Sequence, residues 1–123
     1  MSWDEIKNFQ SSEFDSPDSP GSGVNMNLNF VEILDSIRDS YGHPLSVHSG
    51  YRTPEHNAQV GGVDASAHEE GKAADLSAPT SQERFALVAL AVRKGIRRIG
   101  IGKTFVHLDV DETKPQDVLW LYP

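Results

Sequence analysis

The sequence predicts an α+β domain in which helices cover one face of a small, mainly antiparallel sheet. Two observations support this fold class. Two long segments carry apolar residues at helical spacing, and about five short segments have the pattern of strands. These elements follow one another in mixed order, which is typical of the α+β class. With 123 residues, the chain has the length of one domain, which we expect to span 1–123 with an irregular N-terminal arm at 1–23.

Turn residues and apolar spacing locate the arm and the first helix. Residues 11–23 are rich in Ser, Asp, Pro and Gly, which disfavours regular structure. Asn27 or Asn29 is expected to cap the helix that follows, and Gly42 to end it. Four apolar residues are expected to pin the arm onto the domain, namely Trp3, Ile6, Phe9 and Phe14. The helix itself is predicted from residues at i, i+3, i+4, i+7 and i+11, namely Phe30, Ile33, Leu34, Ile37 and Tyr41.

The middle of the chain predicts two strands around a short helix. Residues 45–49 alternate between apolar and polar side chains, as a strand does. Thr53 is a suitable N-cap for a short helix over 54–60. A loop is expected at 63–71, leading into a strand at 72–78.

The last third predicts a second long helix followed by short strands. Thr80 or Ser81 is expected to cap this helix, and Gly95 lies at its C-terminal end. Its apolar face is expected to contain Phe85, Val88, Ala89 and Val92. Further strands are expected at 98–101, 105–110 and 118–122.

Composition excludes several classes of function. A net charge of −7 argues against binding nucleic acid through its phosphates, which requires clustered Lys and Arg. The absence of cysteine excludes a thiolate metal site, so a metal would have to use His and carboxylate ligands. No apolar run approaches the roughly 20 residues that span a bilayer. We therefore expect a protein without a membrane span, and we expect it to be a monomer. The acidic N-terminus lacks the apolar core of a secretory signal, so the protein is expected to be made in the cytoplasm.

One constellation of residues points to metal chemistry. Alternation along 72–78 and along 105–109 places Asp75 on one strand, and His107 with Asp109 on another, where they can face the same spot. The loop before Asp75 then needs to supply only His68. Two imidazoles and a carboxylate are a ligand set found in hydrolytic zinc sites, where a fourth position is left for water. Taken singly, these residues also fit surface acids and an exposed loop histidine.

A family resemblance favours the metal site. The spaced residues Ser66, His68, Gly71, Ala73 and Asp75 match the Ser-x-His-x-x-Gly-x-Ala-x-Asp signature of the zinc D-Ala-D-Ala carboxypeptidase family. The runs Ser-Gly-Tyr-Arg-Thr-Pro-Glu-His-Asn at 49–57 and Phe-Val-His-Leu-Asp at 105–109 also resemble this family, especially its carboxypeptidase branch. The family includes endolysin peptidases of bacteriophages. The resemblance implies the hedgehog/DD-peptidase-like fold and a zinc ion held by His68, Asp75 and His107, although such ligands can also hold another divalent metal.

The same resemblance implies a substrate and suggests roles for two more residues. The substrate would be a peptide of peptidoglycan, attacked by a water molecule that zinc activates. Arg52 is expected to stabilise the tetrahedral intermediate or to bind a terminal carboxylate; alternatively it pairs with an acid such as Glu55. Ser66 is expected to bind substrate or to stabilise a turn. Trp120 fits either a groove wall or a core position.

The general base is the weakest part of the resemblance. Many relatives carry Glu or Asp three residues before the last zinc histidine, and others carry His two before it. Those positions hold Thr104 and Phe105 here, and neither side chain can accept a proton from water. Asp109 is the preferred substitute, although it can instead hold a ligand imidazole. The remaining alternatives are Glu69 or Glu70, or no base at all.

Two functions from different classes follow. The first is a zinc metallopeptidase, either a D-Ala-D-Ala carboxypeptidase or an endolysin-type endopeptidase, acting at the bacterial cell wall and of phage or bacterial origin. The second is a non-catalytic, zinc-stabilised module that binds peptidoglycan or belongs to a virion. The residues at 104 and 105 favour the second function, and the ligand set alone is compatible with both.

Overall fold

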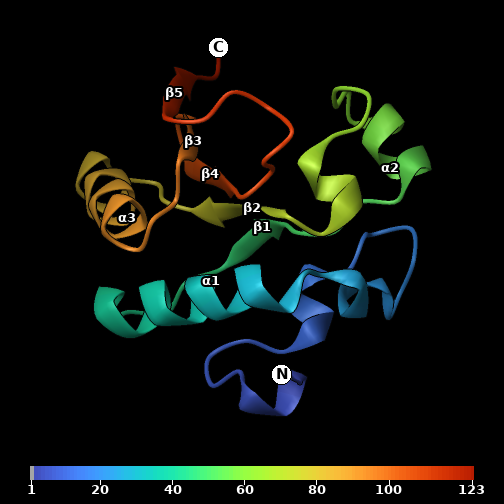
Figure 1. Ribbon diagram of the computed structural model, residues 1–123, viewed down its shortest axis with the longest axis horizontal. Helices are drawn as coiled ribbons and strands as arrows, with labels where there is room; N and C mark the ends of the chain where they lie inside the picture. The colour runs from blue at the N-terminus through green and yellow to red at the C-terminus, as the bar shows by residue number, and fades with distance from the viewer. Residues whose placement is uncertain (1) are drawn as a thin grey trace.

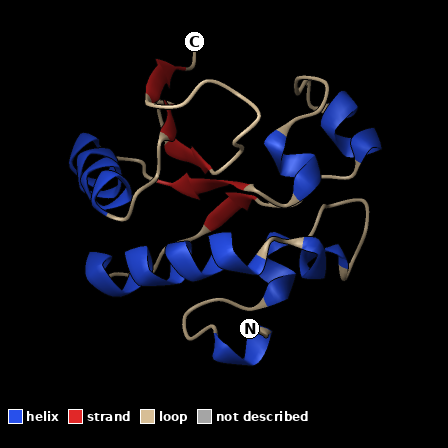
Figure 2. Ribbon diagram, viewed as in Figure 1, coloured by secondary structure: helices blue, strands red, loops and turns tan. Residues whose placement is uncertain are grey.

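The computed structural model describes residues 2–123 and has the predicted α+β architecture. Five strands form one sheet in the order β1-β2-β4-β3-β5, and every pairing is antiparallel except that of β3 with β5. Figures 1 and 2 show the sheet in the centre of the molecule with α1 and α3 packed against it. The strands are β1 (Val47–Ser49), β2 (Ala73–Ser77), β3 (Arg98–Ile101), β4 (Phe105–Asp109) and β5 (Val118–Leu121).

The helices begin and end close to the predicted residues. Of the two predicted caps for α1, Asn27 is the one used, since its side chain accepts a hydrogen bond from the Phe30 N–H. Gly42 ends α1 in the left-handed conformation, at φ 75°. Thr53 caps α2, and Thr80 forms a capping box with Glu83 at the start of α3. The three α-helices are α1 (Leu28–Tyr41), α2 (Pro54–Gln59) and α3 (Ser81–Arg93).

The buried face predicted for α3 is wrong at two of its four residues, although Val88 packs against the core. Phe85 is 77% exposed and Val92 60% exposed, whereas Leu87 and Ala91 are fully buried against the sheet. The residues from 85 to 92 are all apolar, so their spacing does not distinguish one face of the helix from another. Packing against α1 and β4 decides which face is buried.

The core lies between α1, α3 and one face of the sheet. The apolar positions of the two central strands contribute Ala74 and Leu76 from β2 and Val106 and Leu108 from β4. Because side chains alternate along a strand, the residues between these positions project from the opposite face. The sheet thus separates a dry core from a polar face. No helix among residues 2–123 is long and apolar enough to cross a membrane.

The N-terminal arm folds into three short 3-10 helices, η1 (Trp3–Glu5), η2 (Ser11–Phe14) and η3 (Ser22–Asn25). Phe14 is fully buried, with the rings of Trp3 and Phe9 centred 5.8 and 5.4 Å away. Gly50, next to β1, leaves room for this ring, since a β-carbon there would lie 2.8 Å from Phe14. The Phe14 carbonyl also accepts a hydrogen bond from the Tyr51 N–H. The arm is therefore packed against the segment that carries Arg52.

Replacing the buried anchor of the arm tests its contribution to stability. Phe14→Ala is expected to lower the free energy of unfolding by about 3–5 kcal/mol, because it leaves a cavity in a packed core. Phe85→Ala removes the same atoms from an exposed position and is expected to change it by less than about 0.5 kcal/mol. Urea titrations followed by circular dichroism measure both values. Similar losses for the two variants would contradict this account of the arm.

Candidate metal centre

A cleft of about 510 Å³ opens on the polar face of the sheet. One wall is the segment that follows α2, from Val60 to Val63, continued by Ser66 and Ala67. The other wall comes from the C-terminal strands and the loop between β4 and β5, and contains Arg98, Phe105, Lys114, Trp120 and Tyr122. The floor contains Arg52, His68, Asp75, His107 and Asp109. The residues predicted to bind metal and the predicted substrate-binding Arg52 thus line one cavity.

Strand pairing brings two of the three predicted ligands together. Asp75 of β2 lies directly opposite His107 of β4 in the antiparallel ladder, so both side chains leave the same face of the sheet. The third, His68, lies on a 3-10 helix, η4 (Ala67–Glu70), within the segment expected to be a loop. One nitrogen from each histidine and one Asp75 oxygen all lie within 4.8 Å of one another.

Each imidazole is held by one nitrogen and presents the other to Asp75. The Nδ1–H of His68 donates to the Gly50 carbonyl at 2.7 Å, which leaves Nε2 at 3.4 Å from Asp75 Oδ1. In His107 the arrangement is reversed: Nε2 contacts Asp109 Oδ2 at 2.7 Å, and Nδ1 lies 2.8 Å from Asp75 Oδ1. Two differently oriented imidazoles therefore each present one ring nitrogen to the same carboxylate oxygen.

This donor set fits a divalent metal ion. Two imidazole nitrogens and one carboxylate oxygen are a common ligand set of catalytic zinc, which keeps a fourth position open. The outer nitrogens already have the carbonyl and carboxylate partners that usually orient metal-binding histidines. His68, Asp75 and His107 can therefore hold a metal ion.

Electrostatics at the group favour a cation. Burial opposes ionisation of Asp75, but its hydrogen bonds with His107 and His68 outweigh this effect and hold the pKa of the carboxyl below its usual range. Burial likewise opposes a charge on His107, yet hydrogen bonds to Asp109 and Asp75 raise the pKa of this imidazole above its ordinary value. The carboxyl of Asp75 is thus held in its ionised form, the form in which a carboxylate binds a metal ion.

Asp109 lies behind His107, with both carboxylate oxygens engaged. Oδ2 contacts the imidazole, while Oδ1 accepts hydrogen bonds from Arg98 Nε at 2.7 Å and from the Asp111 N–H at 3.1 Å. Its side chain is only 2% exposed. Asp109 and Asp75 contact opposite nitrogens of the same ring, so the imidazole separates Asp109 from the point where the ligands converge.

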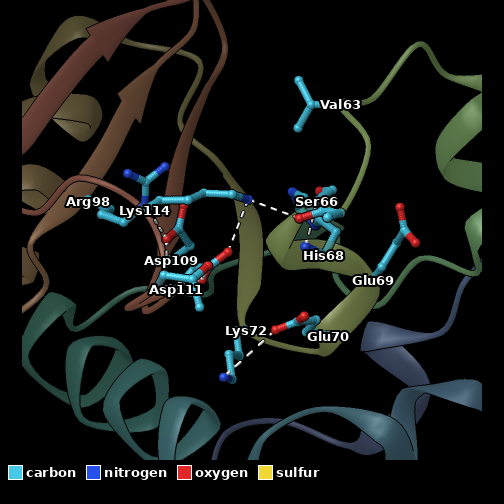
Figure 3. Close-up of polar contacts among 12 residues, drawn as sticks. Val63, Ser66, His68, Glu69, Glu70, Lys72, Arg98, Asp109, Asp111 and Lys114 are labelled. Carbon is cyan, nitrogen blue, oxygen red and sulfur yellow. Dashed lines mark hydrogen bonds and ion pairs between the residues drawn. The ribbon is translucent and has the colours of Figure 1, made fainter.

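The other predicted site residues have different surroundings. Arg52 contacts Asp75 Oδ2 through Nη2 at 3.3 Å and is therefore next to the ligands. Ser66 is buried, and its hydroxyl accepts a hydrogen bond from the His68 N–H at the start of η4. Figure 3 shows Glu69 and Glu70 pointing away from His68, and neither lines the cleft.

Sequence reasoning missed much of the second wall. Arg98 begins β3, as predicted, but its place in the cleft was not predicted: it bonds Asp109 and lies over the Trp120 ring at 5.1 Å. The signal was present in the hairpin between β3 and β4, whose register pairs Arg98 with Asp109. Lys114 was also missed. Its ammonium contacts Asp111 at 3.0 Å and the Ala65 carbonyl at 3.1 Å, and Figure 3 shows it extending towards Ser66.

Trp120 contributes to the cleft wall, one of its two predicted alternatives. Its ring centre lies 5.3 Å from that of His107, and the Tyr122 ring lies 6.3 Å from the same imidazole. Gly100 of β3 makes this possible, because a β-carbon there would lie 2.6 Å from both aromatic side chains. The aromatic wall therefore rests directly on the backbone of β3.

Comparison with known proteins is consistent with this geometry. The family model described as Peptidase M15 matches residues 6–109, from the N-terminal arm to the end of β4. The match includes His68, Asp75 and His107. No curated protein matches the chain.

Metal analysis tests the ligand set. Protein purified without chelator is expected to carry about one zinc per chain, and His68→Ala is expected to lose most of it because one of three ligands is removed. His48→Ala changes an exposed histidine outside the cleft and is expected to keep its zinc. Inductively coupled plasma mass spectrometry measures both. Full zinc content in the His68 variant would contradict the assignment.

Proposed function

We propose that this chain, which belongs to the peptidase M15 family of zinc D-Ala-D-Ala carboxypeptidase-like proteins, is a zinc-dependent peptidase acting on peptidoglycan peptides. The observation that carries the proposal is the convergence of His68, Asp75 and His107 on the floor of a cleft. A cleft of about 510 Å³ is large enough for a short peptide. The bond cleaved would lie in a stem peptide or a cross-bridge.

The three ligands would hold the ion, and their neighbours would keep them aligned. When bound, zinc lowers the pKa of its water to about 7 and polarises the scissile carbonyl. Asp109 would hold His107 through Nε2, and Arg98 would in turn hold Asp109. The Gly50 carbonyl would do the same for His68. Each contact fixes which nitrogen of the ring is free to bind metal.

Arg52 would bind the substrate oxygen on which negative charge develops. Its Nη2 is 3.3 Å from a ligand oxygen, so it lies beside the reacting bond rather than at the far end of the cleft. A guanidinium fixed in this position stabilises an oxyanion without having to reorganise during the reaction. The same group can bind a terminal carboxylate.

The acids of the cleft bear on the question of the general base. Among residues 2–123, the only acids lining the cleft are Asp75 and Asp109. We propose that Asp109 orients His107 rather than accepting the proton, because both of its oxygens are engaged on the far side of the ring. With Asp75 binding the metal and Asp109 holding His107, no acid that lines the cleft in the described part of the chain is free to accept the proton, so the peptidase would turn over its substrate slowly. The same observation favours the alternative function, a non-catalytic, zinc-stabilised module that binds peptidoglycan.

Fragment release separates the two functions. The zinc-loaded protein is expected to release peptide fragments from purified peptidoglycan, identified by mass spectrometry, and the masses identify the bond cleaved. His107→Ala is expected to release none, whereas His48→Ala is expected to match the wild type. If the zinc-loaded wild type binds the polymer and releases nothing, even from soluble stem peptides, the non-catalytic function is the correct one.

The role of Asp109 can be measured through zinc affinity. Asp109→Asn is expected to weaken zinc binding about 10- to 100-fold, because the contact that orients His107 is altered. Competition with chelators of graded affinity measures this change, with Asp117→Asn as an exposed control. If Asp109 is instead the general base, the variant would keep wild-type zinc affinity and lose only its rate.

A further inference from the structure

Asn57 of α2 is buried beneath Arg52, and neither the metal centre nor the proposed chemistry accounts for it. The side chain is 3% exposed, and each of its polar atoms has a partner. Its Nδ2 donates to the Val63 carbonyl and to Glu69 Oε2, both at 2.8 Å. Its Oδ1 accepts a hydrogen bond from Arg52 Nη1 at 3.2 Å.

The chemistry of these partners fixes the orientation of the amide. A backbone carbonyl and a carboxylate both accept hydrogen bonds, so only the amide nitrogen of Asn57 can face Val63 and Glu69. The amide oxygen is then directed at Arg52, which can only donate. The Val63 carbonyl and Glu69 thus together determine that Arg52 meets an acceptor rather than a second donor.

The cleft rim closes around this amide. The Gly62 N–H donates to the Asn57 backbone carbonyl at 2.8 Å. A β-carbon at Gly62 would lie 2.0 Å from Asn57 Oδ1, so the rim can approach only without a side chain there. Together with the bond to Val63, these contacts join the rim to the residue beneath Arg52.

Arg52 is constrained at two nitrogens and presents the third to the metal centre. Nε donates to Ser49 Oγ at 3.0 Å, and Nη1 donates to Asn57. Two contacts on a planar guanidinium fix both its position and its plane, which leaves Nη2 directed at Asp75. A flexible Arg would have to be ordered when substrate binds, and that cost lowers affinity and rate.

We propose that Asn57 is a positioning residue that holds Arg52 in its substrate-binding orientation, and that Glu69, together with the Val63 carbonyl, sets the orientation of Asn57. The catalytic part of this inference rests on the proposed function, in which Arg52 contacts the substrate oxygen. It assigns to Glu69 a role other than that of general base. It also explains why the carboxylate of Glu69 is turned towards α2 and away from His68 (Figure 3).

The first test measures the order of the Arg52 side chain by ¹⁵N relaxation of its Nε–H group and does not depend on turnover. The wild type is expected to show a rigid Nε–H. Asn57→Ala is expected to make it mobile because it removes the acceptor of Nη1, and Glu69→Leu because it removes one of the two acceptors that orient the Asn57 amide. Glu69→Gln is expected to keep it rigid, since the Gln oxygen still accepts from Asn57. An unchanged order parameter in Asn57→Ala and in Glu69→Leu would overturn the proposal.

The second test is kinetic, on whichever stem peptide the wild type cleaves. Asn57→Ala is expected to lower kcat/KM about 100-fold, the scale of loss for a misplaced catalytic contact, with zinc content unchanged. In an Arg52→Ala background the same change is expected to cause almost no further loss. Additive losses would mean that Asn57 acts independently of Arg52 and would overturn the proposal.

A control and a second variant keep both tests decisive. Thr80→Ala removes a hydrogen-bonded polar side chain at the start of α3, away from the cleft and from the arm, and it is expected to leave Arg52 order and kcat/KM unchanged. Glu69 is half-buried, so Glu69→Leu serves if Asn57→Ala does not fold. If the wild type cleaves no peptide, the proposed function fails, while the relaxation experiment still tests the positioning role.

Discussion

The pairing of β2 with β4 is the constraint on which the site depends. It sets Asp75 opposite His107 with their side chains on one face, and it places Leu76 and Val106 on the other face in the core. A shift of one residue in this register would bury the carboxylate and expose the apolar side chains. Core packing therefore fixes the relative position of two of the three candidate metal ligands, and misplacing them would destabilise the whole fold.

Around this pair, two functional side chains are each held by a second polar side chain, which is itself held by a third. His107 is held by Asp109, which is held by Arg98, whose guanidinium lies over Trp120. On the opposite wall, Arg52 is held by Asn57, whose amide is oriented by Glu69. Buried polar groups of this kind are stable only when every member is satisfied, and these networks meet that condition. The result is a cleft whose functional groups are already ordered before a ligand arrives.

Local signals in the sequence predicted more than non-local ones. Caps and alternation located α1, α2 and the strands, and alternation alone was enough to bring Asp75 and His107 to the same face. The apolar face of α3 was mispredicted because the run from 85 to 92 contains no polar residue that would mark the exposed side of the helix. The 3-10 helix that carries His68 spans only Ala67–Glu70, too short to produce a periodic pattern.

The partners of the site residues were harder to predict, for a different reason. Asn57 and Glu69 are twelve residues apart, and the bond between them depends on how the rim folds back over α2. No spacing rule connects them. Arg98 and Asp109 lie on two strands that were both predicted, but their pairing depends on the register of the hairpin. Ligand positions thus follow from local periodicity, whereas their support follows from tertiary packing.

The two histidines differ in where their support comes from. Asp109 shares a strand with His107, so this ligand and its partner move as one unit. His68 is instead oriented by the Gly50 carbonyl, and Gly50 packs directly on Phe14 of the arm. The orientation of His68 therefore depends on a residue whose own position depends on the packing of the arm. In this way the N-terminal arm supports the candidate metal centre, although it supplies no ligand to it.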